Sequence, residues 1–320
     1  MIFSIIFSII VVLLISKNIS YLGNKLRLVD KPTKNKIHKT SVSLLGGPII
    51  FLVLLIFLIP QYKELNLYYH QLICLLIFFT LGLIDDMVNL NSNYKILIVL
   101  FFSLILINFD ESFLIHKIFF EISNNEYYFG KLKIPVTLFC ILLLYIAMNM
   151  SDGINCLLIS FSILALLLTN IFIFNLSLNT IDFAIMFSLI ILFYLNYKNL
   201  IFLGNSGASL LASYFIYKLI NVNYFNQIDV FEVISVFFIM GLDMVRLVIS
   251  RLVRNKNPFE RDLNHFHHLL LKKMNLELTI IFYLILSLAP ILLAQITGLS
   301  VLIFMSISIM IYLFSVNKLY

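Results

Sequence analysis

The stretch that decides the fold is Leu81-Gly82-Leu83-Ile84-Asp85-Asp86, where two adjacent carboxylates end a long apolar run. Residues 72–84 are almost entirely hydrocarbon, which is typical of a membrane-embedded helix. An ionised carboxylate at the edge of such a helix is costly unless an opposite charge lies close by. The chain beyond it has no lysine or arginine before Lys95, so we expect a divalent cation or a phosphate as the partner. A solvated helix end is the alternative interpretation.

Composition places the whole chain in a membrane. Its 320 residues are 62% hydrophobic and only 12% charged, and the mean hydropathy is +1.04. These values exclude a soluble globular protein and indicate an all-α, polytopic integral membrane helix bundle. No internal repeat or hydrophilic linker divides the sequence, so residues 1–320 are expected to form a single domain. Cys74, Cys140 and Cys156 have neither disulfide nor metal-ligand spacing, and we interpret them as core-filling thiols.

Eleven apolar runs are long enough to cross a bilayer as helices, if tilt and ragged ends are allowed for. They lie near residues 2–22, 44–60, 69–84, 95–109, 134–149, 157–175, 180–196, 207–221, 230–249, 277–296 and 299–316. The first run lacks a basic leader and a small-residue cleavage site, so we expect a retained span and not a removed signal peptide. The sequence therefore predicts about eleven transmembrane helices.

Lysine and arginine are distributed unevenly between the two sides that these spans define. Seventeen fall on the side of the connection 17–43 and five on the other. Because positively charged connections stay in the cytoplasm, the first connection is predicted to be cytoplasmic. The same orientation signal accounts for the net charge of +6 without nucleic-acid binding. Helix parity then places five polar segments on the cytoplasmic side: 17–43, Asp85-Asp86, 149–156, 197–206 and 250–276.

Two of these segments are short polar turns between spans. Asn149-Met150-Ser151-Asp152-Gly153-Ile154-Asn155 carries amide and carboxylate groups, and at membrane depth these favour a nucleotide or metal site. An Asx-turn with a permissive glycine is the alternative. Phe202-Leu203-Gly204-Asn205-Ser206-Gly207-Ala208-Ser209 begins a helix, where free backbone amides can bind an anion. A turn that only reverses the chain explains this second segment equally well.

The densest polar segment is Asn257 to His268, which contains three of the six histidines. Its Asp-x-x-His-x-His-His pattern is unusual for a plain surface loop, and we favour a functional role. Together with Arg261, the histidines suit binding of a diphosphate and stabilisation of leaving-group charge. A zinc site is the rival interpretation, although no cysteine or well-spaced fourth ligand accompanies the histidines.

The connection from Asp30 to Lys39 is rich in lysine, and membrane orientation explains most of that charge. Directly after His38, however, Gly46-Gly47-Pro48 enters the second span. Adjacent glycines permit close approach of another backbone at the membrane surface. We therefore include this segment in the predicted site.

Taken in order, these segments resemble the polyprenyl-phosphate N-acetylhexosamine-1-phosphate transferases, which are relatives of phospho-N-acetylmuramoyl-pentapeptide transferase. Each motif is weak alone, but five in order on one predicted face are specific. They are Asp-x-Pro then His and Gly-Gly (Asp30 to Gly47), Gly-x-Ile-Asp-Asp (Gly82 to Asp86), Asn-x-x-Asp-Gly-x-(Asp/Asn) (Asn149 to Asn155), Phe-x-Gly-(Asp)-x-Gly (Phe202 to Gly207) and Pro-Phe-x-x-Asp-x-x-His-x-His-His (Pro258 to His268). The last motif resembles the branch that uses simple UDP-sugars.

The resemblance implies transfer of N-acetylhexosamine-1-phosphate from a UDP-sugar to polyprenyl (undecaprenyl) phosphate, with release of UMP and initiation of a lipid-linked cell-envelope glycan. It further implies a Mg²⁺-dependent enzyme, with Mn²⁺ as a substitute. Such an enzyme is a multi-pass protein of the inner (plasma) membrane, often dimeric, with its site in the cytoplasmic leaflet. The downstream glycan, such as an O-antigen, is left open.

Residue roles follow from the matching motif positions. The implied catalytic residues are Asp85, Asp86, Asp152, His265, His267 and His268. The implied substrate-binding residues are His38, Lys95, Asn149, Asn155, Asn205 and Arg261, where Lys95 contacts an anionic headgroup or anchors its helix. The implied metal ligands are Asp86, Asp152 and Asn205. The motifs leave open which of Asp85 and Asp86, if either, deprotonates the lipid phosphate.

Two departures from the family pattern concern the metal. The family usually has Asp at the position of Asn205 and Ser at that of Ala208. Asn keeps an oxygen ligand but loses a charge, so metal affinity should fall or Asp152 must carry more of the metal. The rival function is a transporter or flippase for a lipid-linked sugar, but only Asp243 and Arg246 lie well inside a span and no repeat is visible.

Overall fold

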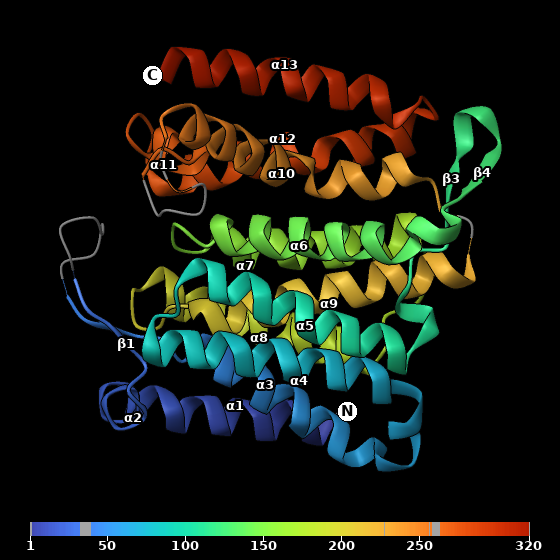
Figure 1. The fold of residues 1–320 in the computed structure, drawn as a ribbon. Coiled ribbons are helices and arrows are strands. Elements are labelled where there is room, and N and C mark those ends of the chain that lie inside the picture. The colour runs from blue at the N-terminus through green and yellow to red at the C-terminus, as the bar shows by residue number, and fades with distance from the viewer. Residues whose placement is uncertain (1, 33–39, 227, 256, 258–262, 320) are drawn as a thin grey trace.

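The computed structural model describes residues 2–32, 40–226, 228–255, 257 and 263–319, with only the backbone of 62–67. This part of the chain is a bundle of long helices that run side by side (Figure 1). The helices are α1 (Ile2–Lys17), α2 (Ile19–Leu26), α3 (Gly46–Leu58), α4 (Leu65–Val88), α5 (Ser92–Phe109), α6 (Lys133–Ser151), α7 (Leu157–Leu168), α8 (Thr180–Tyr197), α9 (Gly204–Phe225), α10 (Val230–Val253), α11 (Phe266–Leu271), α12 (Leu276–Thr297) and α13 (Val301–Leu319). The all-α prediction is confirmed.

A helix covers each of the eleven predicted apolar runs, but the predicted number of spans is not confirmed. Among the described residues, seven helices are long and apolar enough to cross a membrane. An eighth span results if α1 and α2, which meet at a bend of 80°, are taken together. Helices α3 and α7 are apolar but shorter, and α9 is diluted by the Gly, Ser and Asn residues of its first turns.

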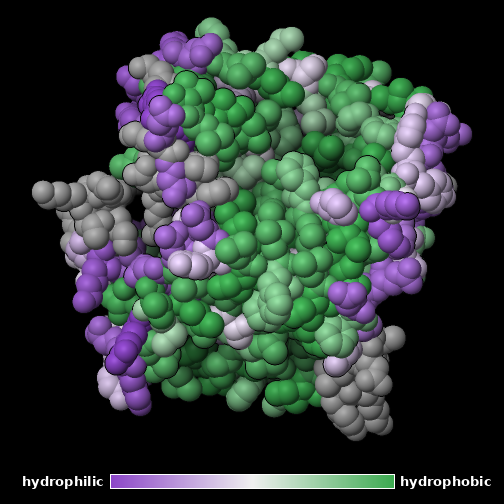
Figure 2. Space-filling view, in the orientation of Figure 1, coloured by the Kyte–Doolittle hydropathy of each residue, from purple (hydrophilic) through white to green (hydrophobic). Residues whose placement is uncertain are grey.

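The surface agrees with a protein whose solvent is lipid. Figure 2 shows a hydrophobic band across the middle of the bundle, with hydrophilic residues gathered toward its two ends. Leu97 and Phe101 on α5 and Met310 and Phe314 on α13 are more than half exposed, which suits contact with acyl chains.

Helix α9 lies at the centre of the bundle and packs most extensively against α4. All its residues from Ser206 to Ile216 are buried, and many are small. Small residues let helix backbones approach closely and make many van der Waals contacts. Such contacts hold helices together in lipid, where the hydrophobic effect does not drive helix association. At Gly82 of α4, an added Cβ would lie 2.6 Å from the Ser206 Cα. The Gly82 and Ser206 segments are therefore held together by backbone packing.

Two small antiparallel ribbons mark the two ends of the bundle (Figure 1). At one end, β1 (Val29–Asp30) pairs with β2 (Val42–Ser43), near α2. At the other end, β3 (Lys117–Phe120) pairs with β4 (Asn125–Tyr128). The end with β1, β2, α11 and the α6–α7 connection, on the left of Figure 1, is called the motif end below.

Candidate active site at the motif end

Asp86 joins the end of α4 to the beginning of α9. Its Oδ1 accepts a hydrogen bond from the Asn205 backbone N–H at 2.8 Å, and its Oδ2 accepts one from Ser206 N–H at 2.9 Å. These are orphan amides of the α9 N-terminus, where the helix dipole favours a negative charge. Gly204 adopts φ +75°, and a Cβ there would lie 2.7 Å from Asp86 Oδ2. The second and fourth motifs therefore form one unit.

The glycines that enter α3 pack against the same helix start. Gly46 N–H donates to the Phe202 carbonyl and Gly47 N–H donates to the Leu203 carbonyl, each at 3.0 Å. A Cβ on Gly46 would lie 2.6 Å from the Leu203 Cα, so only glycine fits there without a backbone shift. The glycines of the first motif thus pack directly against the backbone of the fourth motif. This is the close backbone approach that the sequence predicts for these glycines.

Asp85 has a partner that the sequence interpretation did not give it. Its carboxylate forms an ion pair with Lys95, and its Oδ1 accepts from Leu90 N–H at 2.9 Å. Both side chains are largely withdrawn from the surface, with 2% of Asp85 and 15% of Lys95 exposed. The sequence argument that this acid pair needs a cation or phosphate therefore does not hold for Asp85. It still applies to Asp86.

Asp152 ends α6 and lies close enough to Asp86 for the two carboxylates to interact. Burial raises the pKa of Asp152 to about 7, and the Asp86 charge adds to that rise. A cation beside both groups would remove this repulsion. The second and third motifs are therefore linked electrostatically through these two carboxylates.

The histidines of α11 cover the same turn. A Cβ on Gly153 would lie 2.9 Å from His268 Nε2 and closer still to His267 Nε2. The rings of His267 and His268 are 4.4 Å apart, and those of His265 and His267 are stacked at 5.4 Å. Burial, followed by the neighbouring His268 and His265, holds the pKa of His267 well below its usual value. Its buried Nε2 has no hydrogen-bond partner among the described residues, so it is available to a ligand.

The two asparagines of the third motif differ in what they contact. Asn149 Nδ2 donates to the Tyr145 carbonyl at 2.8 Å, while its buried Oδ1 has no partner in the described part of the chain. Asn155 Nδ2 instead donates to Asn199 Oδ1 at 2.6 Å and to the Asn196 carbonyl at 3.1 Å. Asn149 therefore has an acceptor to offer a ligand, whereas Asn155 fastens the turn to the end of α8.

Asn196 is a residue of this end that sequence reasoning missed. Its Oδ1 accepts from Cys156 N–H at 2.6 Å and its Nδ2 donates to the Ile201 carbonyl at 2.9 Å. It thereby fixes both the α6–α7 turn and the chain before α9. In the sequence, the only indication of this role was that Asn196 is a polar residue at the end of an apolar run. His38 and Arg261, both predicted to bind substrate, lie outside the described residues.

The predicted metal set can be tested against this arrangement. No group of three or more His, Cys, Asp or Glu side chains that could hold an ion occurs in the described segments. Mg²⁺ needs fewer, because it often takes one or two carboxylates and completes its shell with water and substrate phosphates. Asp86 and Asp152, with the unpartnered Asn149 Oδ1 nearby in the chain, fit that requirement. Of Asn205, the structure shows the backbone contact to Asp86.

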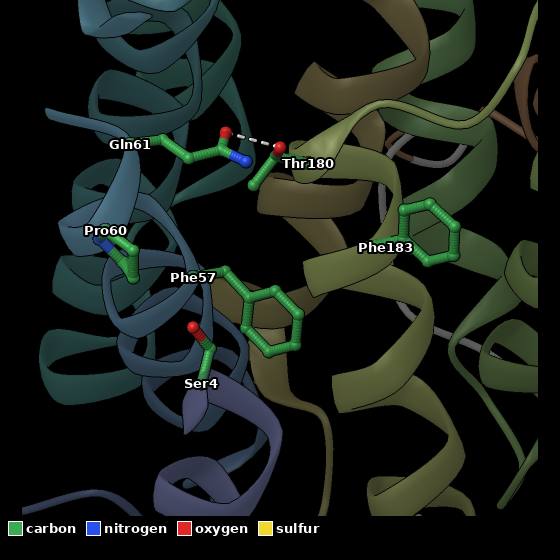
Figure 3. Close-up of a pocket in the computed structure, with 6 residues that line it drawn as sticks. All are labelled: Ser4, Phe57, Pro60, Gln61, Thr180 and Phe183. Atoms are coloured by element: carbon green, nitrogen blue, oxygen red, sulfur yellow. Dashed lines mark hydrogen bonds between the residues drawn. The ribbon is translucent and has the colours of Figure 1, made fainter. Parts of the chain in front are cut away.

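Two cavities lie at the opposite end of the bundle and contain no motif residue. One, of about 60 Å³, is lined by Ser4, Phe57, Pro60, Gln61, Thr180 and Phe183, and the Thr180 hydroxyl donates to Gln61 Oε1 at 2.5 Å (Figure 3). The other, of about 610 Å³, lies between the start of α4 and the end of α9. The polar side chains of the motifs are therefore assembled away from both.

Comparison with known proteins agrees with the site geometry. Residues 68–223 match the model of glycosyl transferase family 4. The "Probable undecaprenyl-phosphate N-acetylglucosaminyl 1-phosphate transferase" of Bacillus subtilis is 25% identical, over 82% of this chain and 75% of its own length. The undecaprenyl-phosphate alpha-N-acetylglucosaminyl 1-phosphate transferases of Thermotoga maritima (28% identical; 80% and 77% covered) and Escherichia coli K12 (26%; 78% and 71%) also match. The middle part of the chain, residues 68–223, is therefore similar to glycosyl transferase family 4, and most of the chain is similar to transferases that act on undecaprenyl phosphate.

Proposed function

We propose that this protein transfers a sugar-1-phosphate, N-acetylhexosamine-1-phosphate, from a UDP-sugar to undecaprenyl phosphate and releases UMP. The names of the relatives support the acceptor lipid and the transferred group. The observation that carries the proposal is the meeting of separate motifs at one end. Asp86 caps α9, the charge of Asp86 acts on Asp152, and the histidines of α11 cover Gly153.

In the proposed reaction, an oxygen of the lipid phosphate attacks the β-phosphorus of the UDP-sugar. A new P–O bond forms, and the bond from the β-phosphorus to the bridging oxygen breaks, so the electron pair leaves with UMP. Catalysis of this kind is mostly positioning and charge neutralisation. When bound, Mg²⁺ would neutralise phosphate charge, held by Asp86 and Asp152 with Asn205 as the third proposed ligand.

The chain's own groups supply the remaining contacts in this proposal. His267 Nε2, buried and without a partner among the described residues, binds the diphosphate or the sugar. Asn149 Oδ1, unpartnered in the same way, accepts a hydrogen bond from the nucleotide. Asp86 is held on the α9 N-terminus by two backbone hydrogen bonds.

The place of the site suits an interfacial reaction. A lipid phosphate stays at the membrane surface while a UDP-sugar arrives from water, so both meet at a helix end and not at mid-membrane. By the distribution of lysine and arginine, the motif end is proposed to face the cytoplasm. We further propose a homodimer in the inner membrane, which mass measurement of the detergent-solubilised protein would test.

The rival function, transport of a lipid-linked sugar, is not favoured. The matching relatives are named as transferases, and the polar groups of the motifs gather at one end of the bundle. Movement of a labelled lipid-linked sugar across proteoliposomes, without any UMP, would reverse this preference.

The decisive experiment is an assay of the purified protein in detergent with undecaprenyl phosphate and Mg²⁺. UDP-N-acetylglucosamine, UDP-N-acetylgalactosamine and UDP-linked deoxy-amino sugars are supplied in parallel, and UMP and the lipid product are measured. We expect UMP release with at least one donor and only when the lipid is present. Failure with every donor, in protein that remains folded, would refute the proposal.

A further inference from the structure

Asp243, an acid inside helix α10, accepts hydrogen bonds from four different groups. Its Oδ1 accepts from Arg246 Nη2 at 2.7 Å and from the Tyr312 hydroxyl at 3.0 Å. Its Oδ2 lies 3.0 Å from His265 Nδ1, and Phe266 N–H approaches both oxygens at 3.1 and 3.2 Å. Only 3% of the residue is exposed. A buried carboxylate with this many donors is ionised and rigidly held.

The same group of residues fastens the chain before α11 to two helices. Arg246 Nη2 donates to the Asn264 carbonyl at 2.6 Å, and Arg246 Nε donates to the Tyr312 hydroxyl at 3.0 Å. Arg246 belongs to α10 and Tyr312 to α13, so three parts of the chain meet at Asp243. The position of the histidine motif is therefore set by an acid that belongs to none of the five motifs.

The contact with Asp243 also selects the tautomer of His265. An ionised carboxylate only accepts hydrogen bonds, so the ring proton must be on Nδ1. Nε2 is then the ring nitrogen left for another group, and among the described residues it has no hydrogen-bond partner. The His265 ring stacks on the His267 ring within 8° of parallel. Fixing the His265 ring therefore also restricts the His267 ring, which lies over Gly153.

We propose that Asp243 is a positioning residue for the sugar-phosphate transfer, holding His265 in the Nδ1–H form so that Nε2 binds the substrate diphosphate. This inference depends on the proposed function. The inference makes the reaction depend on Asp243, a carboxylate that lies outside the five motifs. A carboxylate behind a histidine has this effect in other sites, where it fixes the tautomer and supports positive charge on the ring.

Asp243→Asn tests the proposal with little change in shape. Arg246 and the Tyr312 hydroxyl both donate to Oδ1, so the amide oxygen of Asn is held there, where Phe266 N–H can also reach it. The amide NH₂ then faces His265 Nδ1, which must become an acceptor, and the ring proton moves to Nε2. We expect kcat to fall by about 10²-fold or more, since inverting a catalytic tautomer in this way has cost up to about 10⁴-fold. KM for the UDP-sugar should change far less.

A matched control lies at the opposite end of the bundle. Asp110 is also buried, accepts from the Tyr217 hydroxyl at 3.1 Å, and lies 3.4 Å from His70 Nδ1. Asp110→Asn makes the same chemical change far from the motifs. It should leave kcat within about twofold, because distant sites act independently. An equal loss in both variants would overturn the proposal.

A double-mutant cycle with His265→Gln separates positioning from simple loss of stability. If Asp243 acts through His265, Asp243→Asn should cause no further loss of kcat when His265 is already replaced. Full additivity of the two losses would overturn the proposal. So would wild-type activity of Asp243→Asn.

A spectroscopic measurement keeps the test independent of the reaction. Nitrogen NMR of ¹⁵N-histidine-labelled protein distinguishes protonated from unprotonated ring nitrogens, and His265→Gln identifies the His265 signals. We expect the proton on Nδ1 in the wild type and on Nε2 in Asp243→Asn. An unchanged His265 signal in Asp243→Asn refutes the positioning role even if the protein releases UMP. A protein that shows the expected tautomers but releases no UMP refutes the proposed function instead.

Discussion

Replacing Gly82 by alanine should disturb the site through backbone packing alone. A Cβ at this position would lie 2.6 Å from the Ser206 Cα, and closer still to the Asn205 carbonyl oxygen. Both neighbours are backbone atoms of the α9 start, so no side-chain rotation can make room. Ordinary contact begins at 3.4 Å, so α4 and α9 must separate by about 0.8 Å or more.

That separation acts directly on Asp86, which lies one helical turn after Gly82. Its two hydrogen bonds of 2.8 and 2.9 Å to the α9 amides would lengthen beyond useful range. Overpacking of this kind costs about 1–3 kcal/mol of folding stability. A misplacement near 1 Å can reduce activity about 10²-fold. We therefore expect Gly82→Ala to fold with a lower melting temperature and to release UMP about 10²-fold more slowly.

Gly241→Ala is the matched control, because Gly241 also lies in a long apolar helix but an added Cβ meets nothing within 4 Å. Alanine favours a helix over glycine by roughly 0.5–1 kcal/mol, so this variant should be as stable as the wild type or more stable. Thermal unfolding in detergent and UMP release are measured for both variants. Wild-type activity in Gly82→Ala, with Gly241→Ala unaffected, would refute the packing argument.

Three further outcomes follow from the contacts of single side chains. Asp86→Asn should reduce UMP release by about 10²-fold or more in folded protein, because an amide cannot accept from both α9 amides or neutralise a cation; activity equal to wild type would contradict this assignment. Lys95→Met should destabilise the fold by about 3–5 kcal/mol, since Asp85 is left as a buried, unpaired charge; an unchanged melting temperature would disprove that pairing. In metal-free protein, stability should fall as pH rises from about 4 to 7, because the pKa of Asp152 is raised to about 7 by folding and protons are bound more tightly in the folded state. Asp152→Asn should flatten this dependence, and a profile identical to wild type would show that Asp152 does not cause it.

The sequence was sufficient to predict which segments are helical and which connections share one end. Apolar runs show where helices form, because lipid cannot form hydrogen bonds with free backbone groups. The order of the runs then determines at which end of the bundle each connection lies. All described motif segments meet at one end for that reason. The number of spans was less predictable, because α3 and α7 are short and α9 is unusually polar for a central helix.

The partner of Asp85 could not be inferred from composition or spacing. It depends on the tight turn between α4 and α5, where Asn89 adopts φ +56° and the Asn91 side chain caps α5 by accepting from Asn93 N–H. This turn brings Lys95, ten residues further along the chain, back to the end of α4. A count of nearby basic residues misses a contact that the turn geometry creates.

Asn205 has a clearer meaning once Asp85 is seen to be neutralised. With Lys95 balancing Asp85, Asp86 and Asp152 remain as interacting acids of the motif end that have no ion pair among the described residues. An Asp at position 205, as the resemblance leads one to expect, would add a negative charge to a residue whose backbone N–H already binds Asp86. The Asn removes that charge, so the empty site is less strained but attracts a cation less strongly. On the proposed assignment, the substrate diphosphate supplies the missing negative charge, and metal and UDP-sugar should bind more tightly together than either does alone.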